Sequence, residues 1–120
     1  MDPLTSGAPL DLLAQTVERL ADRLRSLSDV RLARPLPPYP SRAEAAHALA
    51  QQLADGAARV EGRPARLVPR LHDLAAGDQV AVTGHDLLAA LRAAGAAGDA
   101  EAGGAVDAAL AACRDLAASL

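Results

Sequence analysis

The 120-residue sequence contains no lysine, asparagine, isoleucine, phenylalanine or tryptophan, and only one tyrosine and one cysteine. Lysine, asparagine, isoleucine and phenylalanine share AT-rich codons, whereas the abundant alanine, arginine, glycine and proline have GC-rich codons. We therefore expect a GC-rich bacterial gene, and we attribute no function to the missing residue types. A single cysteine excludes a disulfide within the chain, so we expect a reducing cytoplasm as the compartment.

The lack of aromatic side chains also limits the core. Leucine, valine and especially alanine bury little apolar area each, and burial contributes about 25 cal/mol per Å². A chain of this length can fold on such a core, but with little margin of stability. Pairing with a second copy or with another protein would add to that margin.

Charge and hydropathy patterning exclude several classes of partner. No apolar run approaches the roughly 20 residues that span a bilayer, so we expect no membrane partner. The formal net charge of -3 argues against a nucleic-acid-binding protein. Residues 1–7 contain no basic segment followed by an apolar stretch, so we expect no signal peptide.

Four segments carry apolar residues at helical spacing, and they predict helices over about 9–27, 42–61 and 77–92, and a last helix from about 100 or 105 to 119. Their apolar stripes are Leu13, Val17, Leu20, Leu24 and Leu27; Ala46, Leu49, Leu53, Ala57 and Val60; Val80, Gly84, Leu87, Leu88 and Leu91; and Val106, Leu110, Cys113, Ala117 and Leu120. Four such helices predict an all-α four-helix bundle in up-down-up-down order, with a long proline-containing connector between the second and third helices. We expect one helical domain over residues 1–120, with residues 1–8 frayed.

Local signals place the helix ends. Ser41 and Glu44 form a capping-box pattern at the start of the second helix, and Gly62 ends it. Asp78 is the expected cap of the third helix. Ser28 or Asp29 is expected to cap a short helical piece that runs through residue 33.

Two proline-containing segments separate the helices. The run Pro35-Leu36-Pro37-Pro38-Tyr39-Pro40 predicts a stiff connector whose Tyr39 covers one end of the core, although a proline-rich recognition ligand is an alternative. Pro64 and Pro69 prevent residues 63–76 from forming one helix. This second segment holds four large apolar residues, so we expect it to pack across the helices, with a helical turn near 70–75. The four apolar residues are Leu67, Val68, Leu71 and Leu74.

The three histidines are the first candidates for chemistry. A metal site needs converging imidazoles and carboxylates. The residues best placed along the chain to form one are His72, Asp73, His85 and Asp86. We predict neither a metal nor a cofactor, and we keep this group as the candidate for a metal- or ligand-binding alternative.

Two histidine segments resemble phosphorelay proteins. The run from Val82 to Leu91, which contains His85-Asp86-Leu87, resembles the phosphoacceptor helix of sensor histidine kinases. The run Ala46-His47-Ala48-Leu49 is similar to histidine-phosphotransfer domains, which are four-helix bundles of about this size. The resemblance implies His85 or His47 as a phosphoacceptor. Phosphotransfer domains have a lysine and a glycine a few residues after the histidine. In this sequence the corresponding residues, 50 and 51, are alanine and glutamine.

The remaining candidates favour binding over catalysis. Cys113 lies within an apolar stripe, which predicts a structural thiol and not a nucleophile. Arg59, Arg63, Arg66 and Arg70 predict a patch for an anion or an acidic partner, with a solvated loop as the simpler interpretation. The sequence shows no catalytic constellation, so we leave open whether it is an enzyme and favour a non-catalytic interaction protein, either a homodimer or bound to another protein. A ligand-binding bundle around His72 and His85 and a phosphorelay protein are the alternatives.

Overall fold

The computed structural model describes residues 3–95 and 100–120, and within these ranges the regular elements are helices. The α-helices are α1 (Pro3–Arg25), α2 (Asp29–Leu32), α3 (Arg42–Glu61), α4 (Ala76–Ala93) and α5 (Ala100–Ser119), and a 3₁₀ turn, η1 (Asp73–Ala75), precedes α4. The predicted all-α class is confirmed. No helix in these ranges is both long and apolar enough to cross a membrane.

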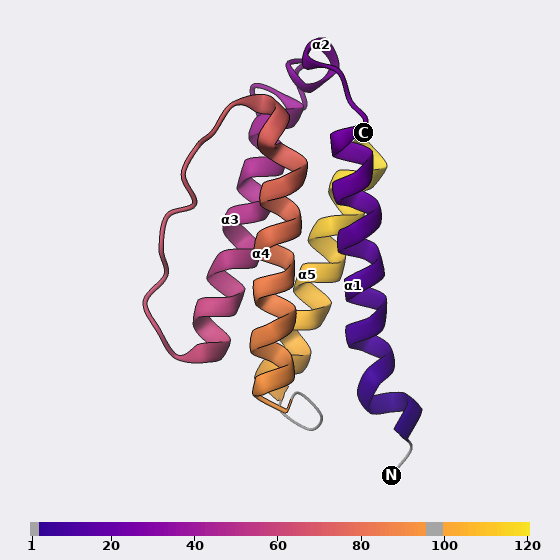
Figure 1. Cartoon of the computed structure of the whole chain (residues 1–120), viewed down its shortest axis with the longest axis vertical. Coiled ribbons are helices and arrows are strands. Elements are labelled where there is room, and N and C mark those ends of the chain that lie inside the picture. The colour runs from indigo at the N-terminus through magenta and orange to yellow at the C-terminus, as the bar shows by residue number, and fades with distance from the viewer. Residues whose placement is uncertain (1–2, 96–99) are drawn as a thin grey trace.

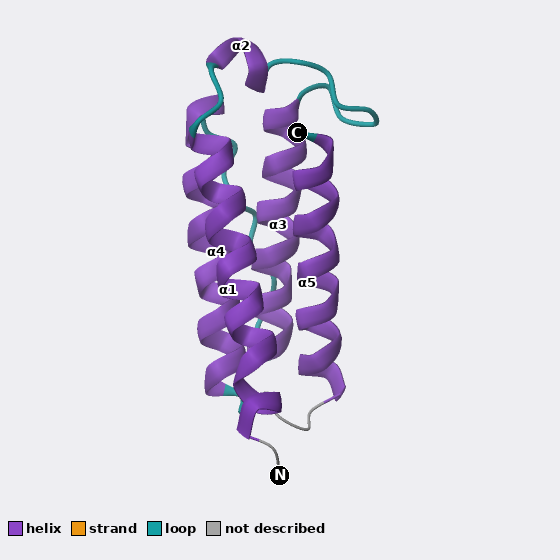
Figure 2. Cartoon of the chain, turned by 90° about the vertical axis from the view of Figure 1, so that its right-hand side faces the viewer, coloured by secondary structure: helices purple, strands orange, loops and turns teal. Residues whose placement is uncertain are grey.

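The four long helices lie side by side (Figures 1 and 2). Helix α4 packs against α3 and α1, and α5 packs against the same two helices from the other side. In Figure 1, α1 and α5 run upward, whereas α3 and α4 both run downward. The predicted up-down-up-down order is therefore wrong. The reason is the segment 63–72, hereafter the connector, which leaves the end of α3 and returns along its length before α4 begins.

The core consists of leucine, valine and alanine side chains from all four long helices, as the stripes predicted. Its largest fully buried side chains are Leu13, Val17, Leu24, Leu32, Leu53, Val80, Leu87, Leu88, Leu91 and Cys113. At the ends of the stripes, Leu27, Val60, Ala117 and Leu120 are only half-buried. Leu32 brings the short helix α2 onto this core, so the segment between α1 and α3 is anchored by apolar packing.

Most of the predicted helix ends are confirmed. The Ser28 hydroxyl accepts from the Arg31 amide at the start of α2, and the Ser41 hydroxyl accepts from the Glu44 amide at the start of α3. Gly62 ends α3 in the left-handed conformation, at φ 68°. The predicted cap at Asp78 is wrong. Helix α4 begins two residues earlier, and the carboxylate of Asp78 instead binds the guanidinium of Arg25 on α1, at 2.8 Å.

The ends of the chain differ in part from expectation. Helix α1 begins at Pro3, within the segment expected to be frayed, and residues 1–2 lie outside the described ranges. Proline suits the first position of a helix because its missing N–H has no partner there. Pro9 lies inside α1. Residues 94 and 95 form a turn after α4, and residues 96–99 lie outside the described ranges.

The proline-rich segment 35–40 forms a tight turn between α2 and α3. The Tyr39 amide donates to the Leu36 carbonyl at 2.7 Å, and the Leu36 amide donates back to the Tyr39 carbonyl at 3.3 Å. Leu36 is half-buried and packs against the core, whereas Tyr39 is exposed. The prediction that Tyr39 covers the end of the core is therefore wrong, and Leu36 takes that position.

Helix α4 approaches α1 closely because two of its residues on the facing side are glycines. An added Cβ at Gly84 would lie 2.5 Å from Cγ1 of Val17, and one at Gly77 would lie 2.7 Å from the carbonyl oxygen of Ala21. Both distances are shorter than any van der Waals contact of carbon. The contact between α1 and α4 therefore depends on the absence of a side chain at these two positions.

Candidate functional site

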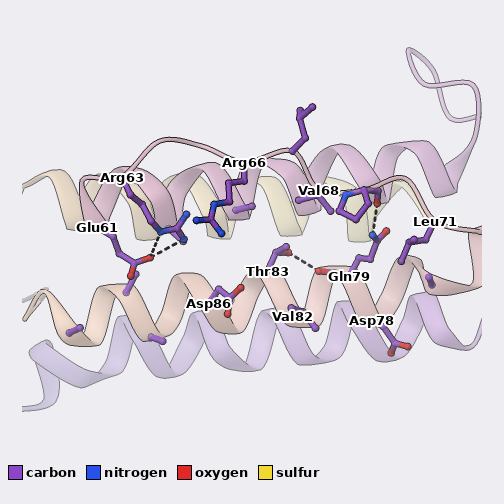
Figure 3. A pocket seen from close by; sticks show the side chains of 18 residues that line it. Glu61, Arg63, Arg66, Val68, Leu71, Asp78, Gln79, Val82, Thr83 and Asp86 are labelled. Carbon is purple, nitrogen blue, oxygen red and sulfur yellow. Dashed lines mark hydrogen bonds and ion pairs between the residues drawn. The ribbon is translucent and has the colours of Figure 1, made fainter.

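A groove of about 1010 Å³ lies between α3, α4 and the connector (Figure 3). Ala54 and Ala57 of α3 form its floor, and one face of α4 forms a wall along nearly the whole length of that helix. The connector forms the opposite wall. Small side chains on the floor leave the space open, because alanine on both helices fills little of the volume beneath the connector.

Polar side chains of α3 hold the connector in place. The side-chain amide of Gln51 donates to the Arg66 carbonyl at 2.9 Å, and its oxygen accepts from the Val68 amide at 2.8 Å. Nε2 of His47 donates to the Val68 carbonyl at 2.8 Å. Gln51 and His47 are four residues apart on one helix, so they face the same side. Together they satisfy the backbone of an extended segment that has no strand partner.

A third side chain joins the connector to α4. The amide of Gln79 donates to the Pro69 carbonyl at 2.7 Å, across one end of the groove (Figure 3). Beside it, Thr83 is buried, and its hydroxyl donates to the Gln79 carbonyl at 2.8 Å. The groove is therefore bridged at the end near the start of α4, and its other end lies near the end of α4.

Apolar side chains on the walls of this groove are exposed. Leu67 is 90% exposed, Val82 is 61% exposed and Leu71 is 47% exposed. The prediction that the connector packs its apolar side chains across the helices is confirmed only for Val68, which is half-buried against the core. Leu74, next to the connector, is also exposed. The connector is held through its backbone, so most of its side chains need not be buried.

The groove also contains charges of both signs. Arg63 pairs with Glu61 at 3.0 Å. Figure 3 shows Arg63 and Arg66 extending from the connector side by side, with Asp86 on the opposite wall. Within the described ranges, neither Arg66 nor Asp86 forms an ion pair. One guanidinium and one carboxylate thus face each other across the groove without meeting.

The structure divides the four arginines that the sequence grouped together. Arg63 and Arg66 line the groove. Arg70 pairs with Glu44 at 2.8 Å and with Asp73 at 2.9 Å, and the hydrogen bonds to Asp73 and Glu44 raise the pKa of Arg70. Arg59 lines a separate hollow of about 140 Å³ between α3 and α5. Only two of the four side chains are therefore placed to act on one ligand.

The structure does not gather the candidate metal ligands. His72 is exposed just before η1, Asp73 pairs with Arg70, and the ring of His85 pairs with Glu18 of α1. Asp86 lines the groove. Residues 3–95 and 100–120 contain no group of three or more histidine, cysteine or carboxylate side chains that could hold a metal ion.

The two histidines of the phosphorelay resemblance both engage a partner through Nε2. That nitrogen of His47 binds the connector backbone, and that of His85 binds Glu18. Cys113 is fully buried and free, and burial raises the pKa of its thiol to about 11. Burial of this thiol agrees with the structural role that the sequence predicted.

Sequence reasoning missed the three side chains that build the groove, namely His47, Gln51 and Gln79 as anchors of the connector. The spacing of His47 and Gln51 was a signal, because two polar residues four apart extend one side of an otherwise apolar helix. Their partners are backbone groups of the connector, which carry no signal in the residue types. Comparisons with protein-family models, curated proteins and solved structures gave no match to this chain.

Proposed function

We propose that this chain is a non-catalytic interaction protein that receives an apolar segment of a partner in the groove between α3, α4 and the connector. In this proposal α1, α3, α4 and α5 form a four-helix bundle that serves as a rigid scaffold. The bound segment covers the exposed apolar side chains on the walls. We keep the cytoplasm as the predicted compartment, because the chain has one cysteine and it is buried.

One observation supports this proposal above the others. Seven large apolar side chains are exposed among the described residues, and three of them, Leu67, Leu71 and Val82, line the same groove. Scattered exposed apolar residues are ordinary on a protein surface, but a cluster around a concave surface indicates a binding site. Backbone anchoring of the connector keeps this cluster in place before a partner arrives, which lowers the entropic cost of binding.

The test compares two matched double variants in a pull-down with the full-length chain as bait. Leu67→Ser/Val82→Ser removes apolar surface from the groove, and Leu12→Ser/Val30→Ser removes it from exposed positions elsewhere. Native lysate and co-expressed untagged bait supply the candidate partners. We expect wild type and the control variant to retain the same proteins, and the groove variant to retain them at least tenfold less. Equal retention by the two variants would overturn the proposal.

The size of the groove supports a second candidate, the binding of a small apolar ligand. Its volume of about 1010 Å³ lies at the upper end of the roughly 300–1,000 Å³ of small-molecule sites. Neither His72 nor His85 lines this groove, so the ligand would lie away from the histidines that the sequence suggested. Mass spectrometry of the purified protein under native conditions would detect a co-purifying molecule. A Leu67→Ser/Val82→Ser protein that retains the same molecule would contradict this second candidate.

A further inference from the structure

We propose that the partner in the groove is a second copy of this chain, joined through a two-fold axis that pairs Arg66 of each protomer with Asp86 of the other. This inference rests on the proposed function, because it names the occupant of the same groove. Two features of the groove lead to it: a ridge that lies beside a hollow, and opposite charges that are separated across that hollow.

The first feature is shape. The connector runs beside α3 as an extended segment (Figure 1), and its residue Leu67, which is 90% exposed, forms a ridge on the surface. The groove that could receive such a ridge lies directly beside it, and its floor is lined by alanine. In a two-fold dimer the same patch is used by both protomers, so a ridge next to a groove is self-complementary. Each protomer then covers the exposed leucine of its partner.

The second feature is charge. Arg66 is on the connector wall and Asp86 is on the α4 wall, and they are too far apart to form an ion pair within one chain. A two-fold axis places the guanidinium of each protomer near the carboxylate of the other, so that both charges gain a partner.

The other charges of the groove do not oppose this pairing. Glu61 pairs with Arg63, and Asp78 pairs with Arg25 of α1, which also pairs with Asp22. Of the five charged side chains that line the groove, three are carboxylates and two are guanidiniums, so the groove presents both signs of charge. A strongly acidic or strongly basic partner would leave one of the two unpaired groups beside a like charge. A second copy satisfies both.

Charge reversal tests the pairing directly. We would compare wild type with Arg66→Glu, Asp86→Arg, the double variant R66E/D86R and an equimolar mixture of the two single variants. Arg59→Glu is the control, because it reverses an exposed charge outside the groove. Sedimentation velocity over a range of concentrations gives the dissociation constant of the dimer. Circular dichroism melting curves report whether each variant is folded.

We expect dimers for wild type and for the control. Each single reversal creates two like-charge contacts in a homodimer and should weaken association at least tenfold. The mixture should recover association, because a carboxylate introduced at position 66 then meets an arginine introduced at position 86, while the native pair forms at the other contact. The double variant should recover it for the same reason. Recovery in the mixture is specific to pairing between chains.

Several outcomes overturn the inference. A wild type that stays monomeric would overturn it. A dimer that neither charge reversal weakens would also overturn it. Recovery in the double variant but not in the mixture would show that Arg66 and Asp86 pair within one chain. A monomeric wild type whose groove still captures a different protein, as judged by Leu67→Ser/Val82→Ser, would leave the proposed function standing and remove only this inference.

Discussion

The close approach of α1 and α4 predicts that Gly84→Ala destabilises the protein. The added methyl group would lie 2.5 Å from Cγ1 and 3.0 Å from Cγ2 of Val17. Val17 is fully buried and β-branched, so its side chain has one strongly preferred rotamer in a helix. Because both methyl groups of Val17 face the new atom, a rotation cannot clear it. The two helices must move apart instead.

Two opposing effects set the magnitude. Alanine is favoured over glycine in a helix by about 1 kcal/mol. Overpacking of a core costs about 1–3 kcal/mol, and the contact at 2.5 Å with a side chain that cannot turn away places Gly84 toward the upper end. We therefore expect Gly84→Ala to lower the free energy of unfolding by about 1–2 kcal/mol.

Urea denaturation followed by circular dichroism measures this change, and two further variants isolate its cause. Gly103→Ala adds a methyl group in α5 at an exposed position with no neighbouring atom within 4 Å, so it should stabilise by roughly 0.5–1 kcal/mol. In a Val17→Ala background the methyl groups that clash are absent, and Gly84→Ala should cost much less. If Gly84→Ala stabilised the protein as Gly103→Ala does, α1 and α4 would not pack as closely as described, and the reasoning would be refuted.

Three further predictions concern the connector, a helix cap and the buried thiol. Gln51→Ala removes two hydrogen bonds to the connector, worth about 0.5–1.5 kcal/mol each, so the Val68 amide should exchange with deuterium about 5- to 150-fold faster, whereas Gln52→Ala should leave it unchanged. Ser41→Ala removes the cap of α3 and should lower the free energy of unfolding in urea by about 1 kcal/mol. The Cys113 thiol has a pKa of about 11 when folded and ionises from about pH 9 when unfolded. The unfolded state therefore loses its proton first, and stability should fall by about 1.4 kcal/mol per pH unit between these values, a dependence that is absent in Cys113→Val. An equal slope in both proteins would contradict the assignment.

The sequence predicted the helices well where the signals are local. The caps at Ser41 and Gly62 depend on hydrogen bonds within one turn and on a left-handed backbone, so the residue type alone identifies them. Asp78 carried the same kind of signal and was assigned wrongly. Its carboxylate accepts a hydrogen bond from Arg25, which lies 53 residues earlier in the chain. In addition, η1 continues directly into α4, which therefore begins before Asp78. A local sequence pattern does not show that a residue distant in the chain will bind the capping side chain instead.

The candidate site was less predictable because it depends on the direction of α4. The arginine cluster correctly pointed to the connector, but four arginines close in sequence are not four arginines close in space. An extended segment separates them, and only Arg63 and Arg66 line the groove. Asp86 was suggested as a metal ligand, whereas the structure places it across the groove from Arg66. Which charges face each other follows from the parallel arrangement of α3 and α4.

The length of the connector contains the information needed for that arrangement. Antiparallel helices need about 2–8 residues between them. Helix α3 has 20 residues and is about 30 Å long, and a chain that returns along it needs about nine or ten residues in extended form. Residues 63–72 supply that span with little to spare. In an extended chain neighbouring side chains have different surroundings, so Val68 packs against the core while Leu67 next to it is exposed. The parallel pair, the exposed leucine and the groove therefore share one cause, a connector long enough to return only when nearly straight.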